Sequence, residues 1–257
     1  IPYIGYGASG FVRVMARVVL APQWSRGQLA RATKEFVKRR GWRSFVTAPC
    51  VRAKVTLTLG DRSVTVLSDR GGYLDHRITP HALGPGWHKV TAQTAQSEPV
   101  ECDVRIIGDE VRFGLISDID DTVLTTWLPR PMIAAWNSFV RDESNRQSIP
   151  GMARFYQQFM DAHPGAAMVY LSTGAWNAYD FLNRFLTVHH YPKAALLLTD
   201  WGPTNTGWFR SGMEHKRTSL LRLAADFPQL KWLLVGDDGQ HDPEIYVLPL
   251  RLAAGLL

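Results

Sequence analysis

Alternating apolar and polar side chains characterise the first hundred residues of the chain. Four runs follow this pattern with many β-branched side chains, at residues 52–60, 62–67, 88–95 and 100–107. Glycine, proline and aspartate residues mark turns between the runs. Because several short strands separated by turns are typical of a β-sandwich, the pattern predicts a β-sandwich-like domain over residues 1–108.

One segment of this domain departs from the alternation. Residues 25–40 contain good helix formers, with Leu29, Phe36 and Val37 lying among basic side chains. We interpret this segment as a basic helix or as a mobile connection between strands.

A different pattern begins after residue 108. Nearly continuous apolar runs occur at residues 111–117, 166–171, 194–198 and 232–235. Segments of helical length occur at residues 131–142, 150–162, 176–187 and 214–226. Buried strands that alternate with helices are typical of a parallel sheet with helices on both faces. The sequence therefore predicts a Rossmann-like α/β domain over residues 109–257.

The charge of the chain divides at the same place. Lysine and arginine number 29 against 23 aspartates and glutamates, which gives a formal net charge of +6. Residues 1–108 account for +9 and residues 109–257 for −3. The basic residues around Trp42, at 38–43, suit either peripheral contact with an anionic membrane or an ordinary solvated face. No recognised nucleic-acid-binding motif accompanies the charge, so we expect no nucleic-acid partner.

Cysteine content and hydropathy limit the cellular setting. Two cysteines, Cys50 and Cys102, are too few for a disulfide framework, and neither has metal-ligand spacing. No apolar stretch reaches the roughly 18–20 residues that span a bilayer. We therefore expect a cytoplasmic protein, peripheral to a membrane at most. Ile1 stands where an initiator methionine would, which fits a processed or truncated chain.

Three carboxylates follow the first apolar run of the second domain. Asp118, Asp120 and Asp121 lie within four positions. Such a cluster is electrostatically unfavourable unless a cation neutralises it, because like charges raise one another's pKa. Mg²⁺ takes oxygen ligands and leaves coordination positions for a phosphate. The cluster therefore predicts a Mg²⁺-dependent phosphate site, although solvated loop aspartates give the same pattern.

The spacing of this cluster is more specific than its charge. Asp118, Asp120 and Thr122 form a D-x-D-x-T motif after a hydrophobic strand, which resembles the first motif of the haloacid dehalogenase superfamily. The resemblance implies that Asp118 attacks phosphorus and forms an aspartyl-phosphate. It implies that Asp120 protonates the leaving alcohol and then deprotonates the hydrolytic water. Within that superfamily, an aspartate at position 120 favours a phosphatase or phosphomutase over a dehalogenase or a P-type ATPase.

Further polar groups follow the later strands. Ser172 is the predicted phosphate ligand after the second apolar run, with Thr173 as the second choice. Lys216 opens a predicted helix, where its ammonium group would offset charge on the phosphoryl group. After the last apolar run, Asp237 is expected to bind Mg²⁺ directly, and Asp242 directly or through water. The Asp118 carboxylate and the Asp120 backbone carbonyl complete the predicted metal site.

Six short motifs occur in order along the second domain. They are S-D-I-D-D-T-V at 117–123, I-P-G-M at 149–152, Y-L-S-T-G-A-W-N at 170–177, L-L-L-T-D-W-G at 196–202, H-K at 215–216 and G-D-D-G-Q-H-D-P-E-I-Y at 236–246. Together they resemble the catalytic domain of the actin-patch-associated phosphatidate phosphatase family, as a bacterial member. The resemblance implies Mg²⁺-dependent removal of phosphate from phosphatidic acid, leaving diacylglycerol.

The chain departs from the family pattern in two places. Fungal members typically have S-N-S-P-W where this chain has S-T-G-A-W at 172–176, so contacts near the phosphate are expected to differ. Only residues 247–257 follow the last motif, which is shorter than the helix and strand expected there in the superfamily.

The intervals between motifs bear on the substrate. Neither 122–172 nor 172–216 has room for a large cap domain, and an open site suits a bulky or interfacial substrate. The predicted entrance residues are Trp127, Arg130, Trp208 and Arg210. A phosphorylated lipid is the preferred substrate class. The alternatives are a soluble phosphorylated metabolite, or a membrane- or protein-binding module with a degenerate phosphatase domain.

Overall fold

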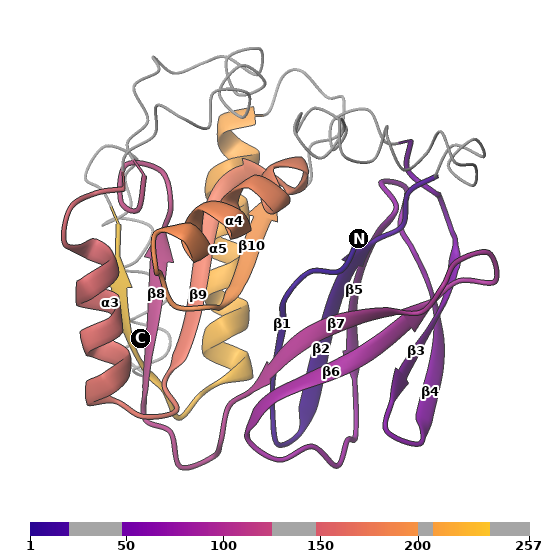
Figure 1. The fold of residues 1–257 in the computed structure, drawn as a ribbon, viewed down its shortest axis with the longest axis horizontal. Coiled ribbons are helices and arrows are strands. Elements are labelled where there is room, and N and C mark those ends of the chain that lie inside the picture. The colour runs from indigo at the N-terminus through magenta and orange to yellow at the C-terminus, as the bar shows by residue number, and fades with distance from the viewer. Residues whose placement is uncertain (21–47, 125–147, 200–207, 237–257) are drawn as a thin grey trace.

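The computed structural model describes residues 1–20, 48–124, 148–199 and 208–236. Two β-sheets lie beside each other in this part of the chain, and its α-helices accompany the second sheet (Figure 1). The elements in chain order are β1 (Gly5–Ala8), β2 (Phe11–Arg17), β3 (Lys54–Leu59), β4 (Arg62–Leu67), β5 (Tyr73–Ile78), β6 (Gly86–Gln93), β7 (Val100–Ile106), β8 (Phe113–Asp118), α3 (Met152–Ala162), β9 (Ala167–Ala175), the 3-10 helix η4 (Trp176–Ala178), α4 (Tyr179–Val188), β10 (Ala195–Thr199), α5 (Trp208–Asp226) and β11 (Lys231–Val235).

The first sheet has seven strands in the order β4-β3-β6-β7-β1-β2-β5. All neighbouring pairs are antiparallel except β1 and β7, which run parallel with Gly5 opposite Val104. The four alternating runs of the sequence become β3, β4, β6 and β7. Strands β1, β2 and β5 are three that the alternation does not predict.

The predicted β-sandwich is wrong, because the seven strands belong to one curved sheet that is nearly barrel-shaped (Figure 1). One buried cluster joins side chains from strands in different parts of this sheet, namely Val14, Leu57, Leu74, Val90 and Val104. Alternation along a strand specifies that one face is apolar, but it does not specify what covers that face. Here the sheet curves over its own apolar face, where a sandwich would use a second sheet.

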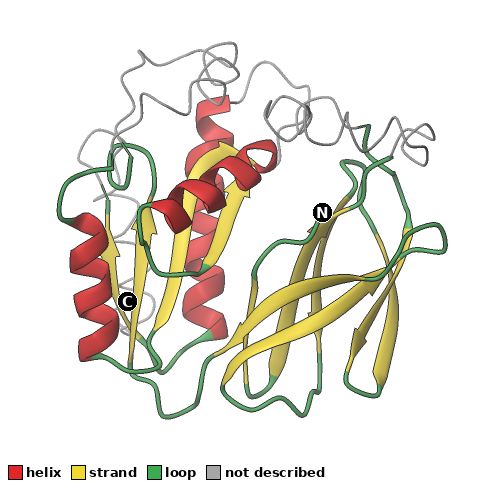
Figure 2. Cartoon of the chain, viewed as in Figure 1, coloured by secondary structure: helices red, strands yellow, loops and turns green. Residues whose placement is uncertain are grey.

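The second sheet has four parallel strands in the order β10-β9-β8-β11. Helices α3, α4 and α5 pack against it (Figure 2). Their buried side chains, including Tyr156, Leu182 and Leu223, share one core with Leu115 and Val169 of the strands.

The predicted fold class is also wrong. We expected a Rossmann-like sheet with helices on both faces as the main architecture, but the larger sheet is mostly antiparallel and the parallel sheet is small. In the described residues, only α3, α4 and α5 are α-helices. The predicted helix at 131–142 lies outside the described residues, as does the basic segment 25–40. The prediction failed because apolar runs identify buried strands without fixing how many strands each sheet has. The division into domains at residue 108 stays a prediction.

Strands β1 and β2 connect the two sheets through their side chains. Both strands are buried on both faces. Val12 and Val14 lie in the core of the seven-stranded sheet, whereas Phe11 and Met15, on the opposite face, belong to the core of the parallel sheet. The first strands of the chain therefore take part in both cores.

Candidate active site

The carboxyl end of β8 carries the first two predicted site residues. Asp118 is the last residue of β8 and lies opposite Leu171 of β9. Its side chain is fully buried, and Asp120 is 8% exposed. In the turn that follows, the Ile119 carbonyl oxygen accepts hydrogen bonds from the backbone N–H groups of Val123 and Leu124, at 2.9 and 3.2 Å. This turn holds both carboxylates at one edge of the parallel sheet.

Lys216 of α5 meets the first carboxylate. Its Nζ lies 2.9 Å from Oδ1 of Asp118, and the two side chains are 1% and 0% exposed. An ion pair this deeply buried loses the solvation of both charges, and removing one partner leaves the other charge uncompensated. The pair joins residues almost a hundred positions apart, as the predicted site requires.

Ser172 of β9 meets the second carboxylate. Its Oγ donates a hydrogen bond of 2.9 Å to Oδ2 of Asp120 and accepts one of 2.9 Å from the backbone N–H of Gly174. Thr173 is only partly buried, and its carbonyl oxygen accepts a hydrogen bond from Oγ1 of Thr199. The geometry therefore brings Ser172, the first choice from the sequence, to the carboxylates.

Next to Asp118 lies a buried pair of hydroxyl groups that the sequence did not predict. Oγ of Ser117 lies 2.6 Å from the hydroxyl of Tyr156 on α3 and donates a 2.6 Å hydrogen bond to the backbone carbonyl of Asp118. Burial raises the pKa of Tyr156, partly opposed by the bond to Ser117. In the sequence, Tyr156 is one aromatic residue among several in an amphipathic segment, so no local signal separates it from the core.

His215 precedes Lys216 and faces β10. Its Nε2 lies 3.4 Å from the carbonyl oxygen of Leu197. Burial lowers the pKa of His215, and the positive charges of Arg222 and Lys216 lower it further, although the Leu197 carbonyl opposes this. The folded protein therefore favours neutral His215.

We expect this histidine to make the fold less stable in mild acid. Below about pH 6.5, His215 binds a proton more readily in the unfolded chain than in the folded protein. The free energy of unfolding therefore falls as the pH is lowered through that range. Between pH 7.5 and 5.5, the Tm of wild type should therefore fall more steeply than the Tm of His215→Gln. The control is His190→Asn, at an exposed histidine. Equal slopes for wild type and His215→Gln would contradict the prediction.

Several predicted residues are not placed by the structure. Trp127, Arg130, Asp237 and Asp242 lie outside the described residues. Trp208 and Arg210 belong to the first turn of α5, but only their backbone is described. The roles predicted for these six residues stay predictions.

Two of the predicted Mg²⁺ ligands can be compared with the structure. Within the described ranges, no three His, Cys, Asp or Glu side chains gather as a metal site would require. Asp118 and Asp120 nevertheless supply hard oxygen donors from a buried turn, which are the donors that Mg²⁺ prefers. The described half of the predicted ligand set therefore fits this ion.

Part of the chain matches a known protein family. Residues 113–252 match the family described as "Phosphatidate phosphatase APP1, catalytic domain". This range begins at β8 and includes Asp118, Asp120, Ser172 and Lys216.

Among the helices that the structure describes, none combines the length and the apolar character that a bilayer span requires.

Two fungal relatives extend the comparison. The chain is 28% identical over 135 residues to phosphatidate phosphatase APP1 of Saccharomyces cerevisiae, which covers 52% of the chain and 23% of that protein. It is 25% identical over 265 residues to an uncharacterized protein of Schizosaccharomyces pombe, covering 94% of the chain and 43% of that protein. The chain thus spans less than half the length of these relatives.

Among solved structures, the chain is similar to a carbohydrate acetylesterase from Xanthomonas citri. The identity is 9% and the TM-score 0.28, over 96% of the chain and 71% of that structure. A likeness this weak does not bear on function.

Proposed function

Because the chain belongs to the phosphatidate phosphatase APP1 catalytic-domain family, we propose that it removes phosphate from phosphatidate and releases diacylglycerol. The family is one of phosphatases, and the match covers the residues that meet at the edge of the parallel sheet. One observation carries the proposal: Asp118 and Asp120, two positions apart, are both buried, and each contacts a residue predicted to bind phosphate.

In the first proposed step, an oxygen of the Asp118 carboxylate attacks phosphorus. The bond from phosphorus to the alcohol oxygen breaks, and an aspartyl-phosphate forms. The carboxyl group of Asp120 gives its proton to the departing alcohol oxygen, which leaves as diacylglycerol. The hydrogen bond from Ser172 to Asp120 supports this role, because it orients that carboxyl group before phosphate binds.

In the second step, Asp120 takes a proton from a water molecule. The water oxygen attacks phosphorus, the bond to Asp118 breaks, and inorganic phosphate leaves with both carboxyl groups restored. Lys216 offsets negative charge on the phosphoryl oxygens in both steps, since its ammonium group lies against Asp118. Ser172 is the proposed hydrogen-bond donor to the phosphate, and it would then exchange the hydrogen bond that it donates to Asp120 for one to a phosphate oxygen.

We also propose Mg²⁺ as the cofactor. Asp118 and the backbone carbonyl of Asp120 would hold it, with Asp237 and Asp242 as the further ligands. Bound there, Mg²⁺ would neutralise phosphate charge that Lys216 alone does not balance.

A phosphate-release assay tests the proposal. Wild type and Asp118→Asn are compared on phosphatidate vesicles and on a panel of soluble phosphomonoesters, with Mg²⁺ or with EDTA. We expect release from vesicles by wild type with Mg²⁺, and background release with EDTA, because the carboxylates then repel the phosphate.

Each other outcome rejects a part of the proposal. Activity on soluble esters but not on vesicles would reject the lipid substrate. Full activity in EDTA would reject the metal. Vesicle binding by wild type without any hydrolysis would favour a binding module.

A further inference from the structure

Helix α5 extends from the active site to the seven-stranded sheet. Its buried residues include Lys216, Leu220, Leu223 and Asp226, at the spacing of one helical face. Lys216 and Asp226 are ten residues apart, which is about 15 Å along a helix. The same rigid element therefore presents a cation to Asp118 at one position and a carboxylate to the other sheet further on.

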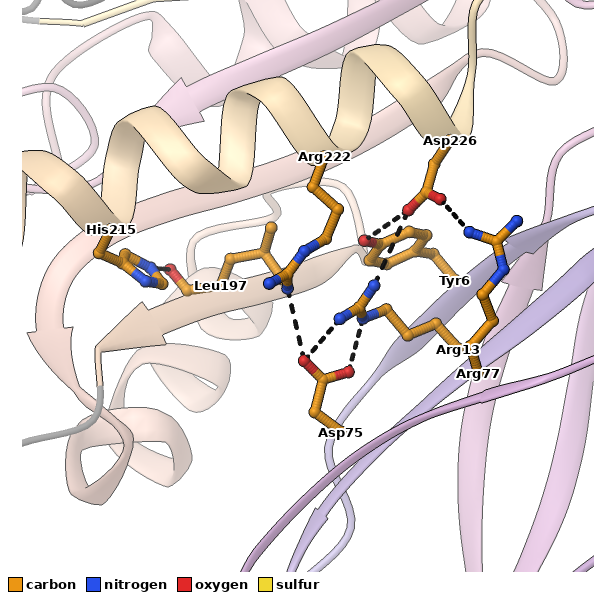
Figure 3. Close-up of polar contacts among 8 residues, drawn as sticks. All are labelled: Tyr6, Arg13, Asp75, Arg77, Leu197, His215, Arg222 and Asp226. Atoms are coloured by element: carbon orange, nitrogen blue, oxygen red, sulfur yellow. Dashed lines mark hydrogen bonds and ion pairs between the residues drawn. The ribbon is translucent and has the colours of Figure 1, made fainter. Parts of the chain in front are cut away.

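Asp226, the last residue of α5, is held by three side chains of the seven-stranded sheet. Its Oδ1 lies 2.6 Å from Nη1 of Arg77 on β5, and its Oδ2 accepts a 3.2 Å hydrogen bond from the hydroxyl of Tyr6 on β1 (Figure 3). Nη1 of Arg13 on β2 lies 3.9 Å from Oδ2. The Asp226 side chain is 4% exposed, so its carboxylate is sheltered from solvent, whereas the Arg77 side chain is half-exposed.

A second carboxylate of the sheet, Asp75, contacts α5 about one turn before Asp226. Asp75 on β5 accepts hydrogen bonds of 2.5 and 2.7 Å from Nε and Nη2 of Arg13, and lies 3.4 Å from Nη1 of Arg222 on α5 (Figure 3). Strand alternation places Asp75 and Arg77 on the same face of β5. Three charged side chains and Tyr6 of the sheet thus hold Arg222 and Asp226, about one turn apart on α5, against one face of the sheet.

Apolar packing continues this attachment. Phe227 follows the end of α5 and is 1% exposed. Its ring centroid lies 5.8 Å from that of Tyr6 and 5.9 Å from that of Phe11. The guanidinium carbon of Arg77 lies 3.9 Å from the centre of the Phe11 ring. The Phe11 ring therefore adds a cation–π contact to the ion pair between Arg77 and Asp226.

The active-site end of the helix is fitted closely against the phosphate-binding strand. A Cβ atom added to Gly212 would lie 3.1 Å from Cγ2 of Thr173, beside Ser172. A small shift of the helix would therefore change the distance between Lys216 and the carboxylates.

We propose that the seven-stranded sheet positions Lys216 in the active site. Asp226 is the positioning residue, because its contacts with the sheet fix the helix α5 that carries Lys216. The inference rests on the proposed function. The seven-stranded sheet is then a structural part of the active site, since the phosphatase domain by itself lacks Arg13, Arg77 and Tyr6.

The test is the variant Asp226→Asn, assayed on phosphatidate vesicles well below its Tm. A misplaced catalytic group lowers the rate of the chemical step, so we expect kcat to fall by about 10- to 100-fold. KM should stay within about two-fold, because Lys216 acts mainly on charge that develops in the transition state.

A double-mutant cycle separates positioning from general damage. If Asp226 acts through Lys216, Asp226→Asn should change kcat less than about two-fold in a Lys216→Met background. A further loss of about 10-fold or more in that background would overturn the proposal. Asp226→Glu keeps the charge and should recover part of kcat, whereas recovery no better than Asp226→Asn would count against a role for the carboxylate.

The matched control breaks a different ion pair between the two sheets. Lys193, just before β10, lies 2.7 Å from Asp103 of β7, and this pair does not involve α5. We expect Asp103→Asn to keep kcat within about two-fold, since surface pairs contribute little. An equal loss in both variants would overturn the proposal, because sheet association in general would then be responsible.

Failure of this inference can be told apart from failure of the proposed function. If wild type hydrolyses phosphatidate and Asp118→Asn does not, the function stands. An unchanged kcat for folded Asp226→Asn then rejects the positioning role alone. If wild type is inactive, the proposed function fails, and the inference that rests on it is rejected too.

Discussion

Asp118→Asn is expected to lower the rate of phosphate release at least about 1000-fold, the scale of loss seen when a catalytic nucleophile is removed. The neutral amide is nearly the same size as the carboxylate but is a far weaker nucleophile. Because Asp118 is fully buried at the end of β8, nearby groups have little room to take its place. Steady-state phosphate release and mass spectrometry of acid-quenched enzyme would measure the rate and the trapped aspartyl-phosphate.

Asp121 provides a matched control three residues further along. It lies in the same turn, its side chain is exposed, and its φ of 58° is one that asparagine adopts readily. We expect Asp121→Asn to stay within about three-fold of wild type. Wild-type rates in Asp118→Asn would disprove covalent catalysis by that residue, whereas losses of similar size in both variants would implicate the turn as a whole.

Lys216→Met should have the second largest effect, and it should act on both activity and stability. Loss of a cation that stabilises transition-state charge typically lowers kcat by about 100- to 1000-fold. Removing one partner of a buried ion pair typically costs about 3–5 kcal/mol of folding free energy, because the remaining charge is left uncompensated. Kinetics and thermal unfolding would measure the two effects separately.

The stability effect has its own internal check. The double variant Asp118→Asn with Lys216→Met removes both charges, so its Tm should exceed that of Lys216→Met while its activity stays absent. Arg217→Met, at the neighbouring and half-exposed position, should change neither property greatly. A double variant less stable than either single variant would show that the pair is not the source of the effect.

The sequence singled out four candidate residues that the structure brings near one another. Asp118, Asp120, Ser172 and Lys216 follow apolar strands or begin a helical segment, and all four come together in the structure. Their roles, and the metal, remain predictions. Tyr156 could not be predicted, because its contact with Ser117 depends on how α3 packs against β8.

The fold was predicted less well than the site. Alternation identified β3, β4, β6 and β7, but the association of strands into sheets depends on contacts between distant parts of the chain. Strand β1 pairs with β7 about a hundred residues later, and neither strand indicates this partner in its own sequence. For the same reason, Arg13 and Arg77 look like ordinary exposed strand residues until α5 brings Asp226 to them.

The double burial of β1 and β2 has a consequence for how the chain folds during synthesis. β1 is synthesised well before β7, its parallel neighbour, which follows about a hundred residues later. The parallel sheet that covers Phe11 and Met15 is synthesised later still. Long-range pairing of this kind slows folding, and we expect β1 and β2 to be exposed to chaperones until the strands of the parallel sheet have been synthesised.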